Sequence, residues 1–141
     1  MASANLELAR SIFAAWHGGD YSSAKWAHPE IEFVIVDGPA PGRWTGVASM
    51  AEAFRDFLSA FEDYHPDAEE FRELDDERIL VLTHSSGRGK TSGVELGQMW
   101  SKGALLLHIH GGKVTRDIMY FDRERAFADL GLTSEAGSSR S

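Results

Sequence analysis

The sequence predicts an α+β fold in which helices pack on the concave face of one curved antiparallel sheet. Amphipathic helical patterns fill most of the first half of the chain, and strand-like segments follow one another in the second half. Gly111 and Gly112 separate the last two of these segments, which is typical of a β-hairpin. Consecutive strands joined by hairpins are antiparallel, and a helical half followed by such a meander indicates an α+β domain.

The first half of the chain supplies the helices. A helix is predicted over residues 3–17, with Ser3 as its cap, because one face is apolar at helical spacing: Leu6, Ala9, Ile12, Phe13 and Trp16. Residues 21–28 predict a short second helix that Pro29 ends, with Trp26 pointing inward.

Strands dominate the remainder, around one more long helix. The apolar segment 31–37 predicts a strand, and Thr45 is expected to cap a helix over 47–62 that has a wide apolar face. Further strands are predicted over 67–74, 78–86, 92–101, 104–110 and 114–121. A short helix over 122–132, with Asp122 as its cap, closes the domain.

Length and charge limit the organisation and the partners. A chain of 141 residues predicts one domain, over residues 1–132, followed by a tail over 133–141 that is small, polar and expected to be disordered. The chain carries 22 Asp and Glu against 14 Lys and Arg, a net charge of −8. Such a chain is poorly suited to binding nucleic acid or an anionic membrane.

Residue types that the chain lacks also limit its chemistry. The absence of cysteine excludes disulfides, thiolate chemistry and Cys-based metal sites. No secretory signal is visible, and no apolar run approaches the ~20 residues of a membrane helix, so we expect a cytoplasmic protein. His108 and His110 share one face of a strand, but a clear third ligand is missing, so we expect neither a metal nor a cofactor.

Five motifs in order carry a family resemblance: IFAAWHGGDY, HPEIEFV, GRWTGVASMAEAF, GGKVTRDIMYFDRERAF and LGL. In this order and spacing, over roughly residues 5–132, the chain resembles the NTF2-like superfamily, in particular its SnoaL-like branch, which also contains ketosteroid isomerases. The resemblance implies a cone-shaped sheet wrapped around N-terminal helices, with an internal pocket. The same fold hosts isomerases, cyclases, dehydratases, epoxide hydrolases and non-catalytic binders, so the resemblance leaves the function open.

An acid, Asp37, ends the first apolar strand of the sequence FVIVDGPAPGRWTG. In ketosteroid isomerases a catalytic aspartate ends the first strand nine residues before the glycine that opens the next helix, and Asp37 lies nine residues before Gly46. The resemblance implies that Asp37 is a general base on the cavity side, with Phe33 and Ile35. The alternative is that Asp37, which precedes a glycine, is a turn residue that bonds its own backbone.

The chain departs from the isomerases at the groups that stabilise an enolate. Their helical tyrosine corresponds to Phe13 and their protonated aspartate to Leu105, and neither replacement can donate a hydrogen bond. Steroid isomerase activity is therefore not expected. The similarity to limonene epoxide hydrolases also fails, because Met119 stands where an acid of their motif would lie.

Asp117 is a second candidate acid. It alternates with Met119 and Phe121, and if those residues face inward, Asp117 enters the pocket as well, where one acid could be ionised and the other protonated. A register displaced by one residue would instead place Asp117 in solvent beside Arg116, and this is the plainer alternative.

Two hypotheses follow from these candidates. The first is a cofactor-independent isomerase, cyclase or dehydratase that acts on a small apolar carbonyl compound through Asp37, with Asp117 or a ring donor assisting. The second is a non-catalytic module that binds an apolar ligand or dimerises. Either would use a pocket that we expect to be lined by Phe13, Trp16, Trp26, Phe33, Ile35, Phe54, Phe57, Tyr64, Trp100, Leu105, Leu107, Met119 and Phe121.

A homodimer through the outer face of the sheet is expected under both hypotheses. Val34 and Val36 point away from the predicted pocket, and Leu106 does so if the register holds. An open apolar sheet face commonly binds a partner.

Overall fold

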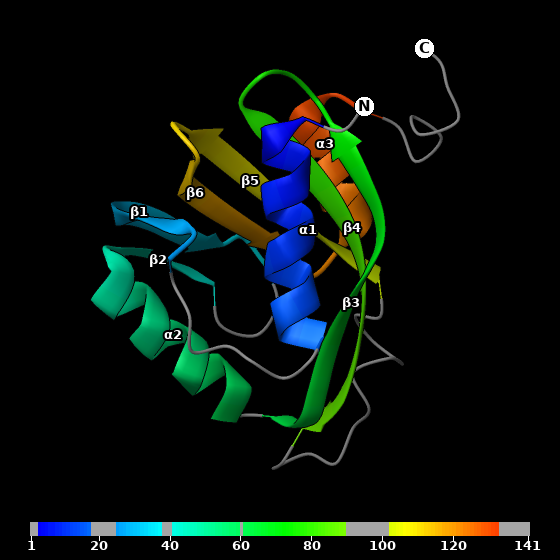
Figure 1. Cartoon of the computed structure of the whole chain (residues 1–141). Helices are drawn as coiled ribbons and strands as arrows, with labels where there is room; N and C mark the ends of the chain where they lie inside the picture. The colour runs from blue at the N-terminus through cyan, green and yellow to red at the C-terminus, as the bar shows by residue number, and fades with distance from the viewer. Residues whose placement is uncertain (1–2, 18–24, 38–40, 60, 90–101, 133–141) are drawn as a thin grey trace.

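The computed structural model describes residues 3–17, 25–37, 41–59, 61–89 and 102–132, apart from the side chains of 17, 61–66 and 85–89. The described residues form three helices and six strands (Figure 1): α1 Ala4–His17, β1 Ala27–Ile35, β2 Gly42–Thr45, α2 Val47–Ser59, β3 Phe61–Glu73, β4 Arg78–Gly89, β5 Lys102–His110, β6 Lys113–Tyr120 and α3 Arg123–Leu130. The predicted strand 92–101 and the predicted tail 133–141 lie outside the described residues.

The six strands form one curved sheet in the order β2-β1-β6-β5-β4-β3. Four of the neighbouring pairs are antiparallel, and among them the pairing of β3 with β4 and the hairpin of β5 with β6 were predicted. The pair of β1 and β6 is parallel, which makes the sheet mixed rather than antiparallel. Parallel neighbours cannot be joined by a hairpin, and here the rest of the domain forms the connection between them.

Two helices cover one face of the sheet and the third helix covers the other. Helix α1 packs against β3 and β4, and α2 packs against β1, β2 and β3. Helix α3 packs against β5 and β6, on the side of the sheet away from α1 (Figure 1). We call the face under α1 and α2 the inner face, and the face under α3 the outer face. None of the described helices is long and apolar enough to cross a membrane.

The first strand begins earlier than the sequence predicts. Ala27 and His28 belong to β1, so the predicted helix over 21–28 is wrong at its end, and residues 21–24 lie outside the described residues. Pro29 lies inside β1, which is tolerated because the pairing with β6 is irregular between Ala27 and Glu32. A proline has no N–H to give to a ladder, so such an irregularity is a site where it fits.

The second strand was not predicted. Gly42–Thr45 pairs with β1, with Trp44 opposite Phe33, and Gly46 then turns the chain into α2 with a φ of 93°. The backbone N–H of Gly46 donates to the Ile31 carbonyl, and the Gly46 carbonyl accepts from the Met50 N–H. A positive φ favours glycine, so this residue both ends β2 and starts the helix.

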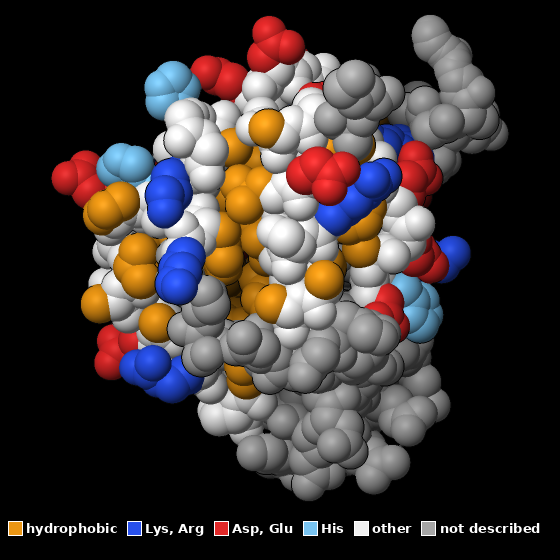
Figure 2. Space-filling model, viewed as in Figure 1, with side chains coloured by type: hydrophobic (Ala, Val, Ile, Leu, Met, Phe, Trp, Pro, Cys, Tyr) orange, Lys and Arg blue, Asp and Glu red, His pale blue; other side chains and the backbone are white. Residues whose placement is uncertain are grey.

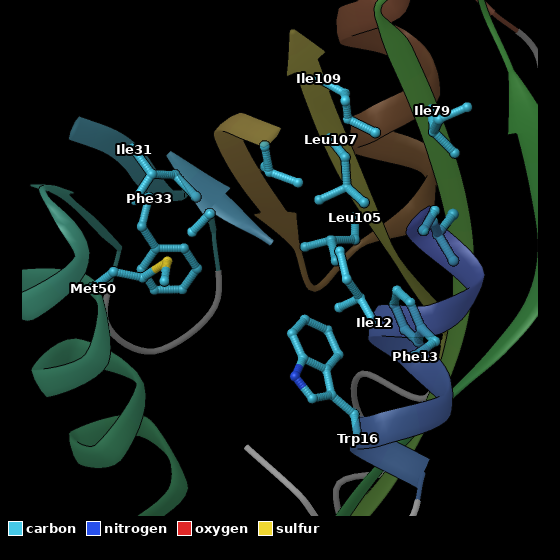
Figure 3. Close-up of a cluster of buried hydrophobic side chains, with 14 of the residues drawn as sticks. Ile12, Phe13, Trp16, Ile31, Phe33, Met50, Ile79, Leu105, Leu107 and Ile109 are labelled. Carbon is cyan, nitrogen blue, oxygen red and sulfur yellow. The ribbon is translucent and has the colours of Figure 1, made fainter. Parts of the chain in front are cut away.

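Each face of the sheet has its own hydrophobic cluster. The inner cluster joins α1, α2 and the sheet, and Figure 3 labels ten of its residues: Ile12, Phe13, Trp16, Ile31, Phe33, Met50, Ile79, Leu105, Leu107 and Ile109. The outer cluster lies under α3 and contains Leu80, Leu82, Ala104, Leu106, Tyr120, Ala126 and Phe127.

The outer cluster changes the surface that was expected to dimerise. Leu106 is only 3% exposed because it packs in the cluster with Phe127 of α3, so it is not open to a partner. Val34 is half-buried, and Val36 packs against the edge of the same cluster. The homodimer stays a prediction that would depend on the part of the face that α3 leaves uncovered.

Candidate active site

Asp117 lies on the inner face, at the centre of the sheet. On β6 it is directly opposite Phe33 of β1 and Leu107 of β5, and both of those residues belong to the inner cluster. Residues directly opposite one another on neighbouring strands point to the same face. Asp117 is accordingly buried with them and only 3% exposed.

The strand register decides between the two alternatives for this acid. The pairing of β5 and β6 shifts between His108 and Ile109, so Val114 and Asp117 both face inward although three positions separate them. Arg116 points the other way and donates to Glu32 at 2.6 Å. The alternative in which Asp117 lies in solvent beside Arg116 is therefore wrong, and the inward register with Met119 and Phe121 is confirmed.

The Asp117 carboxyl lies among apolar side chains. Its Oδ1 is buried and has no hydrogen-bond partner among the described residues. Burial raises the pKa of Asp117 to about 7, through desolvation, because a charged carboxylate is poorly solvated there. Both protonation states are therefore accessible near neutral pH, which is the property that a general acid–base group needs.

The inner face is furrowed beside α1. Figure 3 shows Phe33 and Met50 facing Trp16, Ile12 and Leu105 across this face. The ring of Phe54 lies between the two groups, with its centroid 6.5 Å from that of Phe33 and 5.9 Å from that of Trp16. In the space-filling view, hydrophobic side chains form the floor of a furrow beside α1 (Figure 2). An apolar substrate would match these walls, and a few polar groups would set its orientation.

Asp37 has a different environment and a different set of contacts. Its Oδ1 accepts a hydrogen bond from the Phe121 backbone N–H at 2.6 Å, and its Oδ2 accepts one from the Asp122 N–H at 3.3 Å. The carboxylate thus fastens the end of β1 to the junction between β6 and α3. This contact joins Asp37 to a distant strand, and its role as a base stays a prediction.

The two acids are not direct neighbours. Asp117 is opposite Phe33, whereas Asp37 lies four residues further along the same strand direction and contacts Phe121. At ~3.3 Å per residue these two levels of the sheet are about 13 Å apart. The two carboxyls are therefore not in direct contact, and their sharing of one pocket stays a prediction.

Most of the expected pocket residues belong to the inner cluster. Seven are buried in it, namely Phe13, Trp16, Phe33, Ile35, Leu105, Leu107 and Phe121, and four are partly buried against it, namely Trp26, Phe54, Phe57 and Met119. Trp100 and the side chain of Tyr64 lie outside the described residues. Phe13 and Leu105, at the places of the two isomerase donors, are both core residues.

Three inner-face residues were missed as candidates. Trp44 packs on Phe33 with ring centroids 5.6 Å apart, and Met50 and Ile12 belong to the same cluster. The alternation in GRWT was the available signal for Trp44, because it places Arg43 and Thr45 outward and Trp44 inward.

The described residues bring no three His, Asp or Glu side chains together in an arrangement that could hold a metal ion. His108 is half-buried, and burial together with Arg116 and Arg78 holds its pKa below the usual range. The His110 ring lies 3.2 Å from Glu77.

Comparison with known proteins identifies the fold. No protein-family model matches the chain, and no curated protein matches its sequence. An NTF2-like protein of unknown function from Burkholderia pseudomallei superposes with a TM-score of 0.72 at 19% identity, over 90% of this chain and 97% of that one. A protein with a ketosteroid isomerase-like fold from Catenulispora acidiphila, in complex with trimethylamine, gives a TM-score of 0.65 at 16% identity, over 92% and 95%.

A candidate SnoaL-like polyketide cyclase from Mesorhizobium loti is also similar. It superposes with a TM-score of 0.68 at 15% identity, over 85% of this chain and 99% of that one. These similarities extend over nearly the whole of each chain and agree with the mixed, unclosed sheet and the three helices described above. The chain therefore has the NTF2-like α+β cone fold, which it shares with ketosteroid isomerase-like and SnoaL-like proteins.

Proposed function

We propose that this chain is a cofactor-independent enzyme that moves a proton on a small apolar carbonyl compound, with Asp117 as its acid–base group. The single observation that supports this most strongly is the buried Asp117 carboxyl, whose Oδ1 has no partner among the described residues and whose pKa is raised to about 7. An acid of this kind costs stability, and such costs are commonly retained for function.

The reaction begins with proton abstraction. Asp117 in its ionised form takes a proton from the carbon next to the substrate carbonyl, which leaves an enolate and a protonated Asp117. Returning the proton to another carbon of the enolate gives isomerisation. Attack of the enolate carbon on a second carbonyl, with the proton passing to the new alkoxide, gives aldol-type cyclisation, and departure of a β-hydroxyl group as water gives dehydration.

The developing enolate oxygen needs a hydrogen-bond donor. The indole of Trp16 is our candidate, because Trp16 belongs to the inner cluster together with Phe33 and Leu107, the two residues directly opposite Asp117. Asp37 acts as a positioning residue, since its two hydrogen bonds hold the Phe121 and Asp122 backbone at the end of Asp117's own strand. The name of the Mesorhizobium loti neighbour supports a poly-carbonyl substrate, for which cyclisation is the relevant outcome.

The test is α-proton exchange in deuterated buffer. Ligands are first selected by thermal shift from small ketones and polyketide-like aromatics, and exchange at the carbon next to the carbonyl is then followed by NMR. We expect Asp117→Asn to lower the exchange rate by roughly 10²–10⁴-fold while ligand binding persists. Exchange at the wild-type rate in this variant would refute the assignment.

A second candidate is a non-catalytic binder of apolar carbonyl ligands. The observation that favours it is the presence of Phe13 and Leu105, two core residues without donors, at the places of the isomerase donors. In that case protonated Asp117 donates a hydrogen bond to the ligand carbonyl. Binding would then weaken as the pH rises above about 7, and no variant would change an exchange rate.

A further inference from the structure

We propose that the outer face carries a binding site for a small amphipathic anion, separate from the inner face. A half-open groove of about 460 Å³ lies where the N-terminal end of α3 meets β3, β4 and β5. We call it the α3 groove, and its lining includes Glu70, Arg72, Leu82, Lys102, Arg123 and Phe127. This volume is within the range of small-molecule sites.

Arg72 supplies the first argument for an anion. Its side chain is only 14% exposed, and its Nη1 is buried with no hydrogen-bond partner among the described residues. Its Nε donates to the Glu70 carboxylate at 2.7 Å, and its guanidinium lies 5.4 Å from the centre of the Phe127 ring. A buried guanidinium nitrogen without an acceptor is costly, and a small rotation of this group would present it to an oxyanion in the groove.

Arg123, in the same groove, has hydrogen-bond acceptors for its guanidinium. Its Nε donates to the Gly103 carbonyl, and its Nη2 donates to the Thr83 carbonyl and to Glu69. The hydrogen bond from Arg123 lowers the pKa of the Glu69 carboxyl. Arg123 is therefore a structural clamp between α3 and the sheet, and it leaves Arg72 as the arginine with unused capacity.

Lys102 supplies the second argument. It is exposed at the start of β5 and lines the groove, and its charge contributes to the lowered pKa of the neighbouring Glu69. Two acids of the lining form hydrogen bonds within the protein but keep their charge: Glu70 accepts from Arg72, and Asp122 caps α3 by accepting from the Glu124 N–H at 3.0 Å. Glu124 remains as an exposed carboxylate at the rim, and it should oppose an anion.

The lining also indicates the rest of the ligand. Phe127 and Leu82 line the groove beside the two cations, with only 2% and 4% of their surface exposed. A carboxylate or phosphate head between Arg72 and Lys102, with a small apolar body against the narrow apolar strip that these residues expose, matches this combination. The shared chemistry is an oxyanion joined to a small apolar group.

An NMR titration of the full chain tests the proposal. Benzoate is the amphipathic probe, inorganic phosphate tests the head alone, and benzyl alcohol and benzylamine are the neutral and cationic controls. We expect saturable shifts for benzoate at the backbone amides around Lys102, Arg123 and Phe127, with weaker shifts for phosphate. If phosphate binds more tightly than benzoate, the groove is a site for free phosphate and the amphipathic ligand is refuted. If benzyl alcohol gives shifts as large as those of benzoate, the groove does not select an anion and the proposal is refuted.

Matched variants complete the test. Lys102→Gln and Arg72→Gln should each weaken benzoate about tenfold, and Glu124→Gln should strengthen it, whereas Arg55→Gln on α2 is the remote control of equal charge change. If Arg72→Gln fails to fold, Lys102→Glu decides, because its position is exposed. Unchanged affinity in Lys102→Glu refutes the site. Asp117→Asn should titrate like wild type, so this outcome is independent of the proposed enzymatic function.

Discussion

Asp37 and Phe121 are 84 residues apart in the chain, yet the Asp37 Oδ1 accepts a 2.6 Å hydrogen bond from the Phe121 backbone N–H. The bond lies at the point where the parallel pair of β1 and β6 ends. It continues the ladder that Val36 makes with the Met119 carbonyl, but with a side chain in place of a backbone carbonyl. A carboxylate at this position therefore extends strand pairing by one step beyond β1.

Removal of the Asp37 carboxylate should destabilise the fold. We expect Asp37→Ala to lower the free energy of unfolding by about 1–3 kcal/mol, because the Phe121 N–H loses its acceptor in a partly buried position. Asp37→Asn keeps one oxygen acceptor and should cost less. Urea denaturation measures both, with Asp76→Ala in an exposed turn as the control. Equal stability of the two Asp37 variants and wild type would contradict the role.

Asp117 should destabilise the protein in a pH-dependent manner. Its folded-state pKa of about 7 lies above the ordinary value of 3.8, so the folded state resists ionisation. The cost is absent below pH 3.8, grows by roughly 1.4 kcal/mol per pH unit between these values, and is constant above about pH 7. Asp117→Leu should therefore gain stability over wild type as the pH rises from 4 to 7. A stability difference that does not change with pH would refute the raised pKa.

Activity should depend on the same ionisation. If ionised Asp117 is the base, kcat/KM for proton exchange should rise with pH through an apparent pKa of about 7 and then level off. Asp37→Asn should leave that inflection in place, because Asp37 is a positioning residue. An inflection that moves in Asp37→Asn but stays in a residually active Asp117→Glu would reverse the two roles.

The position of α3 on the outer face gives the expected homodimer a specific test. Val34 is half-buried on the outer face, whereas Leu106 lies under α3 with Phe127. We expect Val34→Arg to yield a folded monomer by light scattering if the dimer uses the uncovered part of this face. Leu106→Arg serves as the contrast, because a charge inside the outer cluster should unfold the chain rather than separate subunits.

Local signals in the sequence predicted the two ends of α3 and the hairpin between β5 and β6. Asp122 caps α3 through the Glu124 N–H, as its residue type and position suggested, and Gly131 ends the helix in the left-handed conformation. Gly111 and Gly112 both have positive φ and join β5 to β6. Such features depend on a few neighbouring residues, so a single sequence contains the necessary information.

Pairing between distant segments was much harder to predict. Pro29 and the helix-like residues before it made the start of β1 hard to predict. The alternation in the four residues of β2 is too short to identify a strand by itself. The direction of Asp117 depended on a bulge between β5 and β6, and a shift of one residue reverses which face a side chain reaches. The contacts of Asp37 depended on the parallel neighbour of β1, which no local pattern reveals.

The parallel pairing of β1 with β6 also has a consequence for how the chain reaches its native state. β1 can complete its hydrogen-bond ladder only after β6, near the end of the chain, has been synthesised. Because this pairing joins distant segments, it raises the contact order and slows folding. Until then β1 and β2 form an unprotected ribbon. A truncation before Lys113 should therefore remove not only a strand but the docking edge for β1, β2 and α2 together, and such a fragment should aggregate rather than fold.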